Sequence, residues 1–184
     1  AFVKGRPALN APGAAFSYSN SGFTILGLVI EKVTGRAAED EIRSRILQPL
    51  GLGDTYMEDF ERPQPSRLPH RYHYATPTFR QTAGIATGFV EVRPDLVDAT
   101  GSNLSVEWTA GGIVSSPRDL VLMMRALRDG RLLDPASLSY MEAWRPARPT
   151  ARTGHGLFQI GTAAGTVIGH NGSVLGFTGS TWWA

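Results

Sequence analysis

The sequence predicts an α+β fold, in which helices come first along the chain and an antiparallel sheet comes last. Helical signals, namely apolar residues spaced three and four apart between capping residues, fill the early and middle parts. Short runs of Val, Ile, Thr, Phe and Trp between glycine-rich turns fill the end. We therefore expect a mainly helical lobe with long loops over residues 1–150 and antiparallel strands over residues 151–184.

The composition favours a packed domain and argues against several kinds of function. The chain has 184 residues, 42% hydrophobic and 18% charged, with a net charge of +2, which is enough for a sizeable core. Its basic residues are scattered, so nucleic-acid binding is not expected. No apolar run approaches the roughly 20 residues of a membrane span. The absence of cysteine excludes disulfides, thiolate metal sites and a cysteine nucleophile.

The first predicted helix begins at Asn20 or Ser21, either of which can cap it. It ends at Gly35, which suits the left-handed residue after a helix. A second helix is expected over residues 37–47, stopped by Pro49. The first helix should be half buried, because apolar residues recur on one of its faces. They are Phe23, Leu26, Ile30 and Val33.

Two later helices are predicted by a capping residue followed by proline. Ser116 precedes Pro117, and Asp134 precedes Pro135. Between the two pairs of helices, five prolines interrupt residues 58–105. We expect long loops there, with one short hairpin over residues 71–79. Three antiparallel strands are expected near the end of the chain, over residues 156–160, 166–169 and 177–183.

The run Tyr18-Ser19-Asn20 stands directly before the first predicted helix. Taken alone, it reads as a helix start, with Asn20 as the cap and Tyr18 packed against the first turn. A tyrosine at a helix N-terminus also lies where the macrodipole stabilises a phenolate. Tyr18 is therefore also a candidate general base toward a serine hydroxyl.

A second candidate is the run His170-Asn171-Gly172-Ser173 on a predicted strand. Taken alone, a histidine on a strand is usually structural. Gly169, Gly172 and Gly176 surround it, however, and glycine within a strand marks the close approach of a ligand or another backbone. The strand edge could pair with an extended substrate, and the Ser173 N–H could be one of two oxyanion donors.

Three segments follow one another in a recognisable order: Phe16-Ser17-Tyr18-Ser19-Asn20-Ser21-Gly22-Phe23, then Thr109 to Ser116 with Asp119-Leu120, then His170-Asn171-Gly172. The first resembles a Tyr-x-Asn segment, and the last resembles a Lys/His-x-Gly motif. Together they resemble the penicillin-recognising serine hydrolases, which include class C β-lactamases, D-alanyl-D-alanine peptidases and esterases. The order of the three segments carries this resemblance, since Tyr-x-Asn alone is a weak signal.

The resemblance implies a β-lactamase/transpeptidase-like fold, here partial, with a helical lobe and an antiparallel sheet that lacks its N- and C-terminal elements. The site would lie between the two lobes. The implied reaction is attack by a serine on a β-lactam, a D-alanyl-D-alanine peptide or an ester, through an acyl-enzyme. It needs no metal or organic cofactor and acts on a small-molecule or peptide substrate. A periplasmic or extracellular location is favoured over a cytoplasmic one.

Carried over residue by residue, the resemblance assigns the base or proton relay to Tyr18 and the orientation of Tyr18 and the substrate to His170. Trp108, before a glycine pair, either walls the pocket or belongs to the core. The remaining substrate-binding roles fall to Asn20, Asn171, Gly172 and Ser173.

The sequence also departs from the family's pattern. Asn171 stands where Thr or Ser is common, and the strand around Phe158-Gln159 offers no arginine for a substrate carboxylate, which keeps an esterase open. The Ser-x-x-Lys motif of the nucleophile is absent, because neither Lys4 nor Lys32 has a serine three positions before it. We therefore expect either a fragment of a longer enzyme, with little turnover alone, or a natural remnant without catalysis.

Other interpretations stay open. A protein on the same scaffold could bind peptidoglycan-like or peptide ligands without chemistry, and the motif matches could be accidental in an unrelated helical module. His70 and His73 could suggest a metal pair, but they lack an acidic third ligand at a familiar spacing, so no metal site is expected. The sequence does not predict an oligomeric state.

Overall fold

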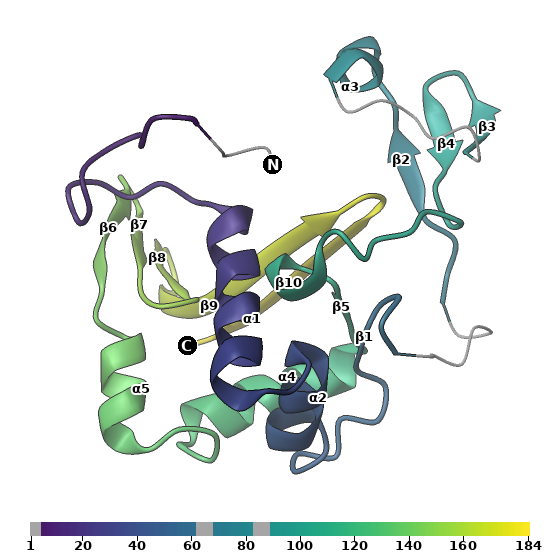
Figure 1. Ribbon diagram of the computed structural model, residues 1–184. Coiled ribbons are helices and arrows are strands. Elements are labelled where there is room, and N and C mark those ends of the chain that lie inside the picture. Colours follow the sequence, from purple (N-terminus) through teal and green to yellow (C-terminus); the bar gives the residue numbers. More distant parts are fainter. Residues whose placement is uncertain (1–4, 62–67, 83–88) are drawn as a thin grey trace.

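The computed structural model describes residues 5–61, 68–82 and 89–184, and it confirms the α+β class (Figure 1). The helices are α1 (Asn20–Thr34), α2 (Ala38–Ile42), η1 (Arg43–Leu47), α3 (Pro77–Thr82), η3 (Trp108–Ala110), α4 (Pro117–Arg128) and α5 (Pro135–Met141). The strands are β1 (Tyr56–Met57), β2 (Tyr72–Tyr74), β3 (Val90–Arg93), β4 (Leu96–Asp98), β5 (Ile113–Val114), β6 (Arg145–Arg148), β7 (Ala151–Thr153), β8 (Phe158–Thr162), β9 (Gly165–Val174) and β10 (Phe177–Trp183). None of the described helices is long and apolar enough to cross a bilayer.

Helix α1 is capped by Ser19, so the prediction of Asn20 or Ser21 as the cap is wrong. Ser19 has the extended backbone that a cap requires, and its hydroxyl accepts a hydrogen bond from the Gly22 N–H at 3.3 Å. Asn20 becomes the first residue of the helix, and its side chain does not cap it. Gly35 ends the helix with φ 70°, as predicted.

The second predicted helix, over residues 37–47, is present in two parts. After α2 the chain continues as the π-helix η1, in which the Gln48 N–H donates to the Arg43 carbonyl at 2.9 Å. This five-residue spacing widens the last turn. The widened turn ends at Leu47, which is buried together with Leu52.

The main sheet has five antiparallel strands in the order β10-β9-β8-β7-β6. The three predicted strands correspond to β8, β9 and β10. The β6–β7 hairpin was not predicted, because Pro146 and Pro149 interrupt the alternation of apolar and polar residues that marks a strand. The sheet therefore begins at Arg145, ahead of residue 151. Strand β9 continues to Val174, beyond its predicted end at residue 169.

The long β9–β10 hairpin extends past its neighbour β8. The first residue of β8, Phe158, pairs with Gly169, so within the described structure residues 170–174 pair only with β10. Figure 1 shows this hairpin reaching toward the small sheet that contains β2. One edge of β9 is therefore open over these residues.

A three-stranded sheet in the order β2-β4-β3 occupies the region predicted as loops. The expected hairpin over residues 71–79 is wrong, since β2 is followed by helix α3 and pairs with β4 instead. The ring of Phe79 on α3 packs on His73 of β2, with centroids 4.4 Å apart. Pairing between strands so distant in the sequence is not visible in a local pattern.

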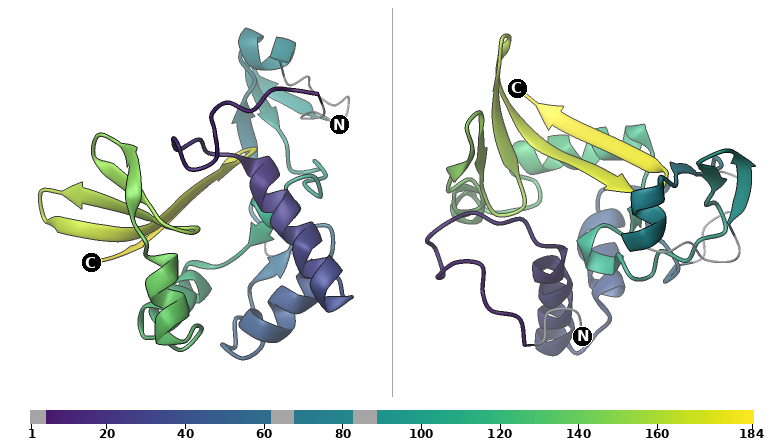
Figure 2. Two further views of the ribbon diagram at one scale, coloured as in Figure 1. Left: turned by 60° about the vertical axis from the view of Figure 1, so that its left-hand side comes forward. Right: turned by 90° about the horizontal axis from the view of Figure 1, so that it is seen from above.

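Helices α4 and α5 pack on one side of the main sheet and close its hydrophobic core. The right-hand view of Figure 2 shows α4 beside the β9–β10 hairpin, and α4 contacts β10. Met124 and Leu127 of α4 lie in the core cluster. Side chains from the helices, the connecting segment and the sheet complete it. They are Met123, Leu132, Leu133, Leu138, Met141, Trp144, Leu157, Ile168 and Trp183.

The carboxylate of Asp119 joins the start of α4 to the segment before β1. It is fully buried, and it accepts hydrogen bonds from the Asp54 N–H at 2.8 Å and the Thr55 hydroxyl at 3.0 Å. Its position in the first turn of α4 also favours the helix, because a negative charge there interacts well with the helix dipole. The structure adds a second role, because this carboxylate satisfies two donors that are distant in the sequence.

We predict that Asp119→Ala lowers the free energy of unfolding by about 3 kcal/mol, because it leaves buried donors without an acceptor. Urea denaturation followed by circular dichroism measures the change. Asp129→Ala, at the exposed end of the same helix, is the control and should change stability by less than about 0.5 kcal/mol. Equal effects of the two substitutions would contradict the anchoring role of Asp119.

The three glycines around His170 are required, or not required, for different structural reasons. A Cβ at Gly169 would collide with the backbone of Thr181 and Trp182 on β10. Gly176 has φ 87° in the turn between β9 and β10. Gly172 has open space around its Cβ position. Only Gly172 therefore leaves room for a ligand, while the other two glycines serve the hairpin itself.

We expect Gly169→Ala to destabilise the chain by about 1–3 kcal/mol, since the added methyl group forces the β9–β10 pair apart. Gly172→Ala lies three residues away on the same strand and should change stability by less than about 0.5 kcal/mol. Thermal melts of the two variants compare them directly. A Gly172→Ala variant as unstable as Gly169→Ala would show that the open space at Gly172 does not exist.

Candidate active site

Tyr18 and His170, which are distant in the sequence, line the same cavity. Its volume is about 380 Å³, and it lies between the start of α1, the segment before α1 and the main sheet. The lining residues are Phe16, Ser17, Tyr18, Ser19, Gly22, Phe23, Leu26, Thr153, Gly154, Gly156, Leu157, Phe158 and His170. The hypothesis drawn from the sequence requires this convergence of Tyr18 and His170.

Aromatic rings hold Tyr18 and His170 side by side. The centroid of the Tyr18 ring lies 6.2 Å from that of His170 and 6.3 Å from that of Phe23. Phe158 packs on His170 at 5.1 Å, and Phe16 meets Phe158 edge to face at 6.1 Å. Tyr18 is nevertheless 48% exposed, so a substrate that enters the cavity can reach it.

The ring of His170 has a defined orientation. Its Nδ1 lies 2.5 Å from the backbone carbonyl oxygen of Asn171. Because a carbonyl oxygen only accepts hydrogen bonds, Nδ1 is the donor. The neutral ring then carries its lone pair on Nε2. His170 can therefore accept a proton or a hydrogen bond at Nε2.

The predicted binding residues Asn171, Gly172 and Ser173 follow His170 along the open edge of β9 and are exposed. A strand edge without a partner presents backbone N–H and C=O groups to an incoming chain. Asn20 is exposed at the start of α1, next to the cap Ser19. None of these four residues lines the cavity itself. They lie within three residues of Tyr18 or His170 in the chain.

Trp108 lies away from the cavity. Its indole N–H donates to Glu39 at 3.1 Å, and a Cβ added to Gly27 of α1 would lie 2.8 Å from its ring. Its backbone has φ 35°, a sparsely populated conformation for a bulky residue. Of the two alternatives for Trp108, this geometry favours packing between helices over a wall of the pocket.

His73 of β2 and His70, which precedes that strand, have separate partners. His70 Nδ1 lies 2.9 Å from the Asp98 carboxylate, while the ring of His73 packs on Phe79. Hydrogen bonds from Thr100 and His70 lower the pKa of Asp98 to about 2. Among the described residues, no group of three or more His, Cys, Asp or Glu side chains could hold a metal ion.

Sequence reasoning missed the apolar lining of the cavity and one of its walls. Phe16 and Phe23 flank the Tyr18 run, and that flanking was the only available signal for them. The β7–β8 turn, which carries Gly154 and Gly156, forms the opposite wall. This turn is anchored by His155, whose backbone N–H donates a hydrogen bond to the Met141 carbonyl at 2.9 Å. Nothing local in the sequence places such a turn opposite α1.

The arrangement can exchange a proton with a bound molecule. Among the described residues that line the cavity, Tyr18 and His170 are the titratable ones. A phenol can donate or accept a hydrogen bond, and a neutral imidazole accepts at one nitrogen. Apolar rings beside both groups exclude water on that side and strengthen their electrostatic interactions.

Comparison with known proteins supports the family resemblance found in the sequence. Residues 1–184 match the family model described as Beta-lactamase. Penicillin-binding protein 4* of Bacillus subtilis (strain 168) is 27% identical over 175 residues, which are 91% of this chain and 36% of that protein.

Solved structures give the same relationship. A D-stereospecific amidohydrolase from Streptomyces sp. has a TM-score of 0.80 and 29% identity, over 94% of this chain and 48% of that one. The D-amino acid amidase from Ochrobactrum anthropi SV3, solved with D-phenylalanine, has a TM-score of 0.78 and 33% identity, over 92% of this chain and 48% of that one. The chain thus spans about half the length of these two structures. It spans a smaller part, 36%, of the curated relative. With its fold, its paired motifs and a family match over all 184 residues, the chain belongs to the Beta-lactamase family.

Proposed function

We propose that the full-length protein is a serine hydrolase that cleaves an amide or peptide bond through an acyl-enzyme. The observation that carries this proposal is the meeting of Tyr18 and His170 at one cavity, with ring centroids 6.2 Å apart. The names of the similar proteins, an amidohydrolase, an amidase and a penicillin-binding protein, support amide or peptide substrates over other bonds.

In this proposal Tyr18 takes the proton of the attacking serine and returns it to the leaving group. His170 accepts at Nε2 and keeps Tyr18 and the substrate oriented, since its Nδ1 is bound to the Asn171 carbonyl. The serine belongs to a part of the protein outside these 184 residues. The open edge of β9 pairs with the substrate backbone, and the Ser173 N–H donates to the oxyanion.

The lining of the cavity supports a substrate with an apolar side chain. Phe16, Phe23, Leu157 and Phe158 give the cavity aromatic and aliphatic walls, and the described lining residues include no Asp, Glu, Lys or Arg. Burial of an apolar group against such walls favours binding by about 25 cal/mol per Å². We therefore propose an amide or short peptide of an apolar amino acid as the substrate class, with β-lactams and esters as alternatives.

A second candidate function is binding without chemistry. The feature that favours it is the absence of a Ser-x-x-Lys motif from these 184 residues. Such a protein would use the same cavity and strand edge to hold a peptide or peptidoglycan-like ligand. Mass spectrometry of the full-length protein after incubation with a β-lactam separates the two candidates, because only a serine hydrolase forms an acyl adduct.

We predict that Tyr18→Phe in the full-length protein lowers kcat for an apolar D-amino acid amide by roughly 10²–10⁴-fold, because the proton relay is lost. The ring contacts with Phe23 and His170 remain. Steady-state assays on the amide, a chromogenic β-lactam and a short-chain ester measure the loss and rank the substrates.

Tyr140→Phe is the matched control for this experiment, since Tyr140 is an exposed tyrosine that stacks on His155 outside the cavity lining. It should retain full activity. Normal turnover by the Tyr18→Phe variant would reject the assignment of the phenol as base.

A further inference from the structure

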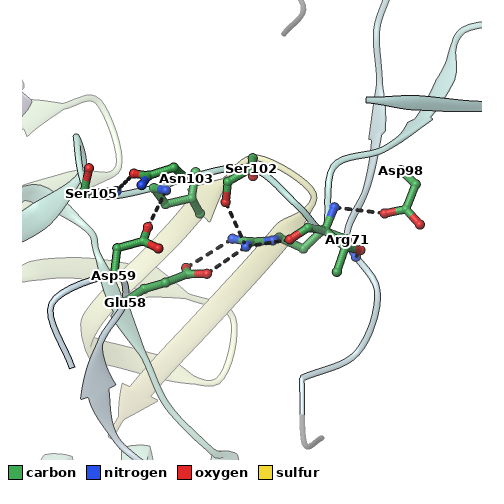
Figure 3. Close-up of polar contacts among 9 residues, drawn as sticks. Glu58, Asp59, Arg71, Asp98, Ser102, Asn103 and Ser105 are labelled. Atoms are coloured by element: carbon green, nitrogen blue, oxygen red, sulfur yellow. Dashed lines mark hydrogen bonds and ion pairs between the residues drawn. The ribbon is translucent and has the colours of Figure 1, made fainter. Parts of the chain in front are cut away.

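We propose that Arg71 is a positioning residue, which clamps the far end of the β9–β10 hairpin and thereby fixes the open edge of β9 that carries Ser173. The proposal rests on the proposed function, in which this edge binds the substrate. Figure 3 shows Arg71 at the centre of a polar cluster, in the region where the sequence predicted long loops and one short hairpin. Arg71 stands immediately before β2, and its residue is only 4% exposed.

The N–H groups of the Arg71 guanidinium donate hydrogen bonds to a carboxylate and to two backbone carbonyls. It donates two parallel hydrogen bonds to the Glu58 carboxylate, at 3.1 and 2.7 Å. It also donates to the carbonyls of Thr100 at 3.2 Å and Ser102 at 3.4 Å. A planar fork of N–H groups fits this set of acceptors, and the single ammonium of a lysine does not. Arg71 thus joins the segment after β1 to the loop after β4.

The other side of Arg71 contacts the hairpin. Its Cζ lies 5.8 Å from the centroid of the Phe177 ring, the first residue of β10. A Cβ at Gly176 would lie 3.0 Å from the Arg71 Cβ and from the backbone of Tyr72. The turn of the hairpin is therefore pressed directly against Arg71, and glycine at position 176 permits this approach.

The same turn is held from a second direction. A Cβ at Gly111 would lie 3.6 Å from a methyl group of Val174, the last residue of β9. Gly111 adjoins Gly112, whose carbonyl accepts a hydrogen bond from the Glu58 N–H at 2.9 Å. Glu58, the partner of Arg71, is thus also tied to the segment that approaches the end of β9.

The clamp lies next to the proposed oxyanion donor. Ser173 pairs with Thr178, which directly follows the clamped pair of Val174 and Phe177. Beyond Gly169 this part of β9 has no second strand beside it in the described structure. Its position therefore depends on β10 and on the contacts at the turn. Loss of Arg71 would free the end of the hairpin without touching Tyr18 or His170.

Hydrogen exchange tests the clamp directly and needs no enzyme activity. In Arg71→Lys, we expect amide exchange over residues 170–178 to accelerate by about tenfold, which corresponds to about 1.4 kcal/mol. Arg43→Lys is the matched control, because Arg43 also pairs with a glutamate, Glu61, and a backbone carbonyl, but it does not contact the hairpin. Exchange of the hairpin in Arg43→Lys should equal that of the parent chain.

A second variant separates local loosening of the hairpin from a general loss of stability. Phe177→Leu removes the ring that faces Arg71 and leaves the ion pair with Glu58 in place. It should accelerate exchange over residues 170–178 as Arg71→Lys does, with a smaller fall in Tm. If neither variant changes exchange in the hairpin more than Arg43→Lys does, the clamp is overturned.

Kinetics of the full-length protein test the consequence for the site. Arg71→Lys should lower kcat by roughly 10–100-fold through misplacement of the Ser173 N–H. KM should rise as well, because the freed edge also binds the substrate, whereas the pH profile should change little, because the side chains of Tyr18 and His170 are not altered. Unchanged kcat with accelerated exchange would overturn the positioning role. A parent protein that hydrolyses none of the substrates would instead reject the proposed function, while the exchange experiment still decides whether Arg71 clamps the hairpin.

Discussion

The pairing of β9 with β10 is the constraint on which the candidate site depends. The two strands keep a continuous register from Ile168 with Trp183 to Val174 with Phe177, and Gly169 lets their backbones approach. One end of the hairpin is fixed in the core beneath α4 through Ile168 and Trp183. The other end projects beyond β8 and meets Arg71. His170 lies between a rigid end and an end that needs its own support.

The start of α1 supplies the facing side of the site. Ser19 satisfies the first turn of the helix, so neither Tyr18 nor the Asn20 side chain is required for capping. The helix itself is held by close packing, because Gly27 allows Trp108 and Thr109 to approach its backbone. The cavity forms where this fixed helix end faces β8 and β9. Its geometry is thus set by two independent packing arrangements, one in each lobe.

The chemistry that this part of the protein can supply is proton exchange and substrate binding. Tyr18 and His170 provide the titratable groups, aromatic rings provide an apolar wall, and the open edge of β9 provides backbone donors and acceptors. Membership of the Beta-lactamase family places these features in a hydrolase fold. The similar solved structures have chains about twice as long as the part that matches this one. The proposed nucleophile lies outside the 184 residues.

The sequence by itself determined the α+β class, the end of α1 at Gly35, the starts of α4 and α5, and the motifs that carry Tyr18 and His170. Each of these depends on neighbouring residues, through caps, helical spacing or a short motif. Only the tertiary structure decided the three-stranded sheet, the β6–β7 hairpin, the place of Trp108, the apolar lining and the partners of Asp119 and Arg71. These depend on contacts between residues distant in the chain, which leave no local pattern because the free energy of such contacts is realised only when the segments meet.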